Sequence, residues 1–193
     1  MEQLTKRQNE IVQTSIKLIS EGGIQNFTMK SLAAHLGVSE PAIYRHFSCK
    51  MDILLSMLQK IEDTNIIFKK EIEENSPSLS MIEHMFVQNS KVFINNPELS
   101  SIIFSEEIFQ NNKILSDKVL NIMWKRNNLT SKVIAEIQKN GEIRNDISPE
   151  KLTTIIIGTL RLTISKWRLS GFSFDLAIEL QEIWVAISSI LTV

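Results

Sequence analysis

Apolar residues recur along almost the whole chain at the three- and four-residue spacing of an α-helix. Ile11, Ser15 and Leu18 belong to one such stripe, and no convincing run alternates polar and apolar residues as a half-buried β-strand would. Gly, Pro and Asn residues that end helices separate the stripes. About nine helices fit between these breaks, near residues 4–21, 28–35, 39–46, 50–74, 79–94, 97–110, 113–140, 149–169 and 174–191. The sequence therefore predicts an all-α fold.

The predicted helices change in length along the chain, and this change indicates a domain boundary. Helices before residue 48 are short, whereas those after it are long. Residues 1–60 hold seven cations and five anions, while the remainder holds 14 cations and 17 anions. The N-terminal part is therefore the better match for phosphate groups. We expect a three-helix N-terminal domain over residues 1–48 and a helical C-terminal domain over residues 49–193.

Composition and charge exclude several classes of protein. A net charge of −1 over 193 residues gives no field that would draw the whole molecule to nucleic acid or to an acidic membrane. The single cysteine, Cys49, cannot form an internal disulfide or a zinc cluster. The longest uncharged apolar stretches, residues 152–160 and 183–193, are much shorter than the roughly 20 residues that span a bilayer. We expect a cytoplasmic protein without membrane contact.

The sequence also lacks the patterns of common catalytic and metal sites. It contains no nucleophile and base pair, no Gly-rich phosphate loop and no His, Cys, Asp or Glu cluster with metal-ligand spacing. The acidic pairs Glu73-Glu74 and Glu106-Glu107 lie on predicted helices whose other faces are apolar, which is typical of a solvated surface. The sequence therefore predicts no enzyme, no metal and no cofactor.

Residues 28–47 have the form of a helix-turn-helix. Thr28 can cap the first helix, Gly37 can adopt the left-handed conformation of a tight turn, and Ile43 can wedge between the two helices. In this motif the second helix enters the major groove of DNA and flanking polar groups hold phosphates. The outward face here is polar enough for that role. The residues predicted to contact DNA are Thr28, Lys30, Ser39, Glu40, Pro41, Ala42, Tyr44, Arg45, His46 and Lys50.

The segment from Ser39 to Phe47, followed by Lys50, resembles the signature of the tetracycline-repressor-like (TetR) family of bacterial transcriptional regulators. The resemblance covers about residues 8–58, around a quarter of the chain. It implies phosphate contacts for Thr28, Tyr44, His46 and Lys50, and base contacts for Ser39, Glu40, Pro41 and Ala42, with Arg45 at the edge. Because DNA phosphates repel a carboxylate, we expect Glu40 to pair with a neighbour such as Arg45 rather than to read a base. Cys49 and Met51 depart from the usual pattern of the family.

Residues 79–140 are rich in adaptable Met and aromatic side chains. Core packing accounts for most individual residues of this kind, and the alternative is a cavity between helices that takes an apolar or amphipathic small-molecule effector. The family resemblance favours such a cavity. The residues predicted to line it are Met81, His84, Met85, Phe104, Phe109, Met123, Trp124 and Asn127.

The last two predicted helices are apolar over more than one face. Such a helix lies at the centre of a domain or packs against a partner, and Gly158 would allow close approach. We expect a twofold homodimer joined by a four-helix bundle, as the resemblance also implies. The residues predicted at this interface are Ile156, Leu160, Ile164, Trp167, Leu180, Trp184 and Ile187.

These features together predict a homodimeric, double-stranded-DNA-binding transcriptional regulator, a repressor that a small-molecule effector releases from a palindromic operator. Two other functions stay open at this level. One is a nucleoid-associated or architectural DNA-binding factor without an effector. The other is an all-helical ligand-binding module with no DNA role.

Overall fold

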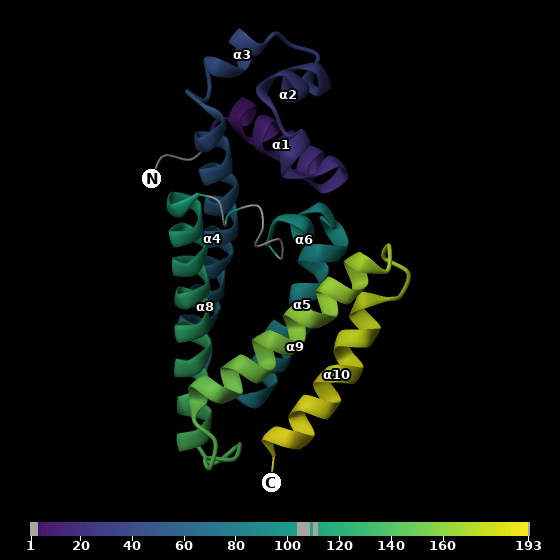
Figure 1. Cartoon of the computed structure of the whole chain (residues 1–193). Coiled ribbons are helices and arrows are strands. Elements are labelled where there is room, and N and C mark those ends of the chain that lie inside the picture. The colour runs from purple at the N-terminus through teal and green to yellow at the C-terminus, as the bar shows by residue number, and fades with distance from the viewer. Residues whose placement is uncertain (1–3, 104–108, 110–111, 193) are drawn as a thin grey trace.

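The computed structural model describes residues 4–103, 109 and 112–192 of the chain. The described residues form helices and connecting loops without a strand, so the all-α prediction is confirmed. Within these residues the helices are α1 (Lys6–Asn26), α2 (Met29–Leu36), α3 (Glu40–Tyr44), α4 (Lys50–Glu74), α5 (Leu79–Asn95), α6 (Glu98–Ile103), α8 (Lys113–Lys139), α9 (Pro149–Leu169) and α10 (Leu176–Leu191) (Figure 1).

Local sequence accounts for where the helices begin and bend. At the start of α1, the Thr5 hydroxyl accepts a hydrogen bond from the Gln8 amide at 3.2 Å, and the Gln8 carboxamide oxygen accepts one from the Thr5 amide at 3.0 Å. Gly23 has φ 73° and ψ 167°, which interrupts α1 close to the end predicted at residue 21. The Asp175 carboxylate caps α10 by accepting from two amides of its first turn. These are interactions between close neighbours in the sequence, so most predicted boundaries lie within a few residues of the observed ones. The helix end predicted near residue 110 lies outside the described residues.

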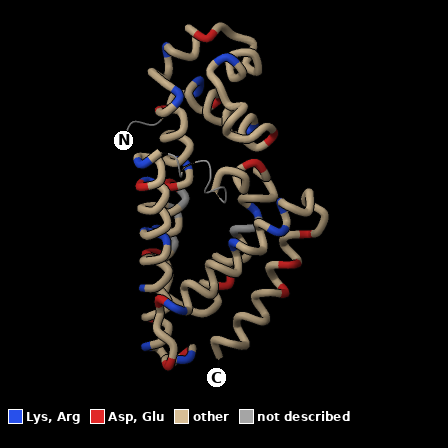
Figure 2. The backbone as a smooth tube through the Cα atoms, viewed as in Figure 1, with Lys and Arg blue, Asp and Glu red and all other residues tan. Residues whose placement is uncertain are grey.

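The helices are arranged as a small N-terminal head on a longer body (Figure 1). α1, α2 and α3 form the head, and α4 runs from it into the body beside α8. α9 crosses the body and packs against α8, while α10 packs against α5 and α9. Each described helix contains charged residues (Figure 2), and none of these helices is long and apolar enough to cross a membrane.

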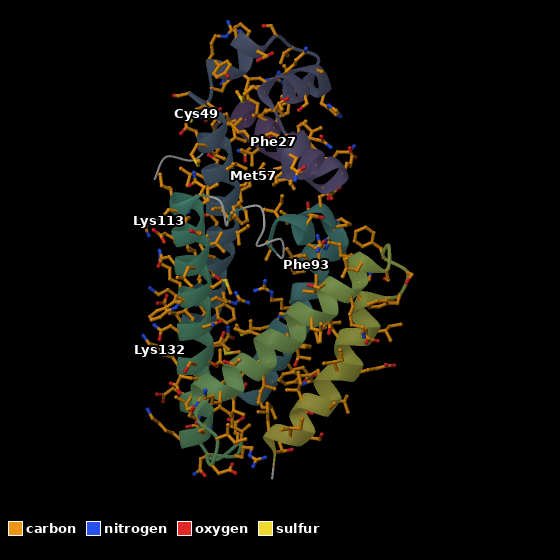
Figure 3. All side chains as sticks on the ribbon, in the orientation of Figure 1. Phe27, Cys49, Met57, Phe93, Lys113 and Lys132 are labelled. Atoms are coloured by element: carbon orange, nitrogen blue, oxygen red, sulfur yellow. The ribbon has the colours of Figure 1, made fainter. Side chains whose placement is uncertain are left out.

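Two clusters of buried apolar side chains form the core. The first joins α1, α2 and α3 to the first half of α4 and includes Phe27 and Met57 (Figure 3). The second joins α5, α9, α10 and the last part of α8 and includes Phe93. Leu99 of α6 packs against both clusters. The division of the chain after residue 48 stays a prediction, and α4 is the helix that continues from the head into the body.

A charged contact fastens α4 to α8. The buried carboxylate of Glu62 on α4 accepts a hydrogen bond from the Lys118 ammonium and another, at 2.5 Å, from the Lys125 ammonium. Hydrogen bonds from Lys118 and then Lys125 lower the pKa of the Glu62 carboxyl below its ordinary value. One carboxylate therefore holds two points of α8 against the helix that leads from the head.

Candidate nucleic-acid interface and ligand cavity

The predicted helix-turn-helix is present as α2, a short turn and α3. Gly37 ends α2 with φ 65° and ψ 31°, the left-handed conformation that a glycine adopts without a steric penalty. The Val38 amide then donates to the Ala33 carbonyl at 3.0 Å and closes the turn. Ile43 is buried where α3 meets α2, as the wedge between the two helices. Turn and wedge are confirmed.

The two predicted cap residues of the motif differ in whether their side chains form a capping hydrogen bond. The Thr28 hydroxyl accepts from the Ser31 amide at 3.0 Å, and the Ser31 hydroxyl accepts from the Thr28 amide at 2.9 Å. Ser39 occupies the cap position of α3, but its side chain makes no capping hydrogen bond. The exposed Ser39 hydroxyl is therefore not committed to holding the end of its own helix.

The residues predicted to contact DNA are all at least partly exposed. Thr28, Lys30, Ser39, Pro41, Tyr44 and Arg45 are exposed, and Glu40, Ala42, His46 and Lys50 are partly exposed. No ion pair joins Glu40 to Arg45 in the described part of the chain, so the expected pairing is not seen. The Gln8 carboxamide donates to the His46 carbonyl at 3.1 Å and ties the start of α1 to the end of the motif. The DNA contacts of the ten predicted residues stay a prediction.

The Lys50 side chain has a role inside the head that the sequence did not indicate. Its ammonium donates to the Phe27 carbonyl at 2.5 Å and lies 5.0 Å from the centroid of the Phe27 ring. Partial burial lowers the pKa of the Lys50 ammonium. The side chain thus fastens the start of α4 to the junction of α1 and α2. A phosphate contact would have to share this ammonium, which has three hydrogens to donate.

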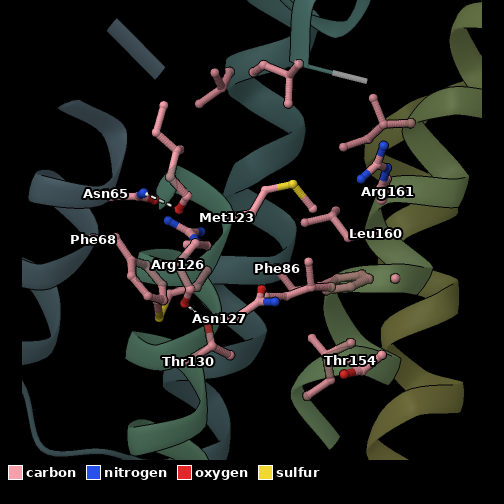
Figure 4. A pocket seen from close by; sticks show the side chains of 18 of the residues that line it. Asn65, Phe68, Phe86, Met123, Arg126, Asn127, Thr130, Thr154, Leu160 and Arg161 are labelled. Atoms are coloured by element: carbon pink, nitrogen blue, oxygen red, sulfur yellow. Dashed lines mark hydrogen bonds between the residues drawn. The ribbon is translucent and has the colours of Figure 1, made fainter. Parts of the chain in front are cut away.

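A cavity of about 360 Å³ lies in the body between α4, α5, α8 and α9. Its apolar lining residues are Ile61, Phe68, Ile82, Met85, Phe86, Val92, Phe93, Ile103, Ile122, Met123, Val133, Ile156, Ile157, Leu160 and Ile164. Its remaining lining residues are Asn65, Arg126, Asn127, Thr130, Thr154, Gly158 and Arg161 (Figure 4). An apolar hollow with a few polar groups is typical of a site for a small molecule.

The polar lining residues are held by specific contacts. The Arg126 guanidinium lies 3.6 Å from the centroid of the Phe68 ring, a cation–π contact between α8 and α4. The Asn65 amide donates to the Ile122 carbonyl at 3.2 Å, and the Thr130 hydroxyl donates to the Arg126 carbonyl at 3.1 Å (Figure 4). Asn127 and Thr154 are exposed although they line the cavity, so the cavity opens between α8 and α9.

The predicted cavity residues are only partly brought together. Met85, Met123 and Asn127 line the cavity. Met81 packs against the second core cluster, and Phe109 is buried in the first, beside a smaller hollow. His84 is exposed, and Trp124 is 72% exposed. Phe104 lies outside the described residues.

Several lining residues were missed because the prediction considered only residues 79–140. Phe68 comes from α4 and Arg161 from α9, which lie on either side of that segment in the sequence. Arg126 was missed inside it, because a charged residue on a long helix reads as solvated. The sequence pattern of a single helix does not indicate whether four helices leave a cavity between them.

The residues predicted at the dimer interface lie almost entirely inside one chain. All of them except Leu160 are buried, in the second core cluster. They pack against other helices of the same chain and have little surface left for a partner. The apolar residues of α9 and α10 that are exposed instead are Ile155, Leu162, Leu169, Ile178, Val185 and Ile190.

Comparison with known families agrees with the geometry of the head and body. Residues 11–57 match the family model described as "Bacterial regulatory proteins, tetR family", and residues 54–189 match that of "YsiA-like protein, C-terminal region". The chain belongs to the tetR family. It is a DNA-binding transcriptional regulator, and the helix-turn-helix of α2 and α3 is its DNA-binding element.

Relatives of this tetR regulator differ in what they regulate. The chain is 23% identical over 177 residues to the fatty acid metabolism regulator protein of Bacillus subtilis, with 91% of each chain covered. It is 26% identical over 192 residues to the nucleoid occlusion factor SlmA of Vibrio campbellii, covering 96% of this chain and 95% of that protein. Two of these relatives are thus a metabolic regulator and a nucleoid factor.

Solved structures show the same fold. The transcriptional regulator FadR from Bacillus subtilis in complex with stearoyl-CoA has a TM-score of 0.82 at 21% identity, covering 97% of this chain and all of that one (100%). The ketosteroid transcriptional regulator KstR2 of Mycobacterium tuberculosis has a TM-score of 0.83 at 14% identity, covering 99% and 97%. At these identities the likeness concerns the arrangement of the helices.

Proposed function

We propose that this tetR regulator represses transcription from a palindromic operator and leaves it on binding a small molecule with a long apolar chain and an anionic head, the class to which stearoyl-CoA belongs. The observation that carries the proposal is the apolar cavity with the cationic side chain of Arg161 in its lining. Resemblance to a fatty acid metabolism regulator and to a FadR complex with stearoyl-CoA supports the ligand class. The protein would act in the cytoplasm, where the operator lies, and without catalysis.

The chemistry of the cavity suits an acyl chain. Each methylene group that moves from water into an apolar lining contributes about 0.8 kcal/mol. A nucleotide carrier such as CoA is too large and polar for a cavity of about 360 Å³, so it would remain at the opening between α8 and α9. Arg161 lines the cavity from α9, two helical turns after the exposed Thr154, and offers a cation to phosphate or thioester oxygens.

Contacts between the body and the head connect the cavity to the DNA-binding helices, so that effector binding would release the operator. Ile103 of α6 lines the cavity, while its neighbour Ile102 is buried in the first core cluster. The Ser101 hydroxyl lies 3.2 Å from the Ser20 hydroxyl of α1. An acyl chain that displaces α6 would therefore move α1, and one that displaces Phe68 would move α4. A coupling of about 1 to 3 kcal/mol between the two sites would suffice for regulation.

The homodimer that a palindromic operator requires would use the exposed apolar faces of α9 and α10. Ile155, Leu162 and Leu169 lie along α9, and Ile178 and Val185 lie along α10. Gly158 of α9 is exposed as well and lets a partner helix approach closely. Two such copies would present their α3 helices to half-sites one helical turn or more apart.

The effector proposal is tested by adding stearoyl-CoA to the protein bound to fluorescent DNA from upstream of its own gene. We expect apparent DNA affinity to fall about 5- to 150-fold, and CoA alone to have no effect. Met85→Trp should fill part of the cavity and weaken this response at least 10-fold, an effect on the order of that expected from closing an apolar site. Ile94→Trp, on the same helix but outside the cavity, is the matched control.

An unchanged response of the Met85→Trp variant would contradict the cavity as the site. DNA binding without sequence preference, at many sites and indifferent to stearoyl-CoA, would favour the nucleoid-associated function to which the SlmA resemblance points.

The phosphate contacts of the head are tested by salt dependence. Lys30→Ala and Arg45→Ala should each reduce the slope of log affinity against log salt concentration by about 0.9 per protomer, because each removes one phosphate contact. Lys132→Ala removes an exposed cation from α8, far from the head (Figure 3), and should leave the slope unchanged. If all three variants keep the wild-type slope, Lys30 and Arg45 do not contact the DNA phosphates.

A further inference from the structure

The cavity contains a buried polar side chain on its α4 side. Asn65 of α4 is 7% exposed and lines the cavity among apolar neighbours. Its amide nitrogen donates to the Ile122 carbonyl at 3.2 Å. This is the one hydrogen bond of the Asn65 side chain within the described part of the chain, so its carboxamide keeps an acceptor oxygen and one further hydrogen to donate.

Arg126 lies at the same wall. Phe68, one helical turn after Asn65 on α4, is the ring over which the Arg126 guanidinium stacks at 3.6 Å. Figure 4 shows Asn65, Phe68 and Arg126 together on the α4 side, and Leu160 and Arg161 across the cavity on α9. We call Asn65 and Arg126 the inner polar subsite. It lies across the cavity from Arg161, near which the head of the proposed ligand would be held.

A plain hydrocarbon end is a poor match for this subsite. Asn65 would lose access to water when the cavity fills, and a methyl group offers its carboxamide no hydrogen bond. An oxygen on the end of the chain would accept from the Asn65 amide or the Arg126 guanidinium, and a hydroxyl would also donate to the Asn65 oxygen. The head of the ligand does not meet this need, because its carrier stays at the opening.

We propose that the inner polar subsite binds an oxygen at the far end of the effector, so that the preferred effector is an acyl chain with a hydroxyl or carboxyl group at its terminal carbon. The inference rests on the proposed function, since it assigns the chemistry of the same cavity's ligand. Asn65 is then the residue that distinguishes oxygenated from plain acyl chains.

The test compares three series of CoA thioesters with 8 to 18 carbons, namely saturated, ω-hydroxy and ω-carboxy acyl chains. Their affinities are measured by calorimetry and by release of operator DNA. At the best-fitting length, we expect the oxygenated thioesters to bind the wild-type protein at least about 10-fold more tightly than the saturated one. Asn65→Leu should reduce this preference to what the Arg126 guanidinium alone contributes, and the variant should still bind saturated chains. Asn127→Leu, at the opening, should retain the full preference.

A second variant separates selectivity from folding. Asn65→Asp keeps the size of the side chain, and its carboxylate should still accept from an ω-hydroxyl group but repel an ω-carboxylate, so it should bind ω-carboxy thioesters at least about 10-fold less tightly than the wild type. Equal binding of plain and oxygenated chains by the wild-type protein at every length would overturn the inference and leave the proposed function intact. Failure of every thioester to bind would overturn both.

Discussion

Val185→Asp is expected to convert the proposed dimer to monomers and to lower operator affinity at least about 100-fold, because two linked heads gain that much over one from effective concentration. Val185 is 62% exposed on α10, in the apolar face through which we propose that two copies pair. A carboxylate there would lose its water in the interface without gaining a partner. Sedimentation gives the oligomeric state, and fluorescence anisotropy on operator DNA gives the affinity.

Ile114→Asp provides the matched control for this prediction. Ile114 is 61% exposed on α8, outside the proposed interface. The same substitution at nearly equal exposure should therefore leave the oligomeric state and the operator affinity unchanged. If Val185→Asp sediments as a dimer and binds the operator normally, the faces of α9 and α10 do not form the interface.

Glu62→Gln is expected to lower the free energy of unfolding by about 1 to 3 kcal/mol at pH 7, the usual worth of hydrogen bonds to a charged group. The substitution removes the charge that Lys118 and Lys125 share across the contact of α4 with α8. Urea unfolding followed by circular dichroism measures the difference. Glu136→Gln, which breaks the exposed pair with Lys139, should cost less than about 1 kcal/mol.

The effect of Glu62→Gln depends on pH in a direction set by the lowered pKa of Glu62. A carboxyl whose pKa is lower in the folded than in the unfolded chain stabilises the fold at pH values above its ordinary pKa of 4.5, and this contribution is lost as pH falls through the folded-state value. The wild type and the variant should therefore converge in stability as the solution is acidified below pH 4.5. An equal difference at pH 7 and pH 3 would contradict the ion pairs as its cause.

Features that depend on close neighbours in the chain could be predicted before the structure. The turn at Gly37, the cap at Thr28 and the wedge at Ile43 all lie in residues 28–47, and the structure confirms each of them. Gly37 can take a positive φ at no cost whatever surrounds it. The helix-turn-helix and its DNA-binding role were therefore accessible from the sequence.

The lining of the cavity could be predicted from the sequence only in part. Met85, Met123 and Asn127 were expected there and line it, whereas Asn65 and Arg161 come from helices that the prediction did not consider. A cavity exists where four helices distant in sequence fail to fill the space between them. Apolar periodicity reports the inward face of one helix at a time, so it cannot report that space.

Helix α9 illustrates that the sequence pattern of one helix does not determine which of its apolar faces is buried. Ile155 and Ile156 are neighbours of the same chemistry, yet Ile156 packs inside the chain and Ile155 is exposed. The sequence reports that the helix is apolar on both faces, and only the packing of α9 against α8 and α10 selects the inner one. In the same way, only the fold brings the Phe27 carbonyl to the Lys50 ammonium, for which the family resemblance implies a phosphate contact. Helix ends and turns follow from backbone preferences of neighbouring residues, whereas burial depends on how whole helices meet.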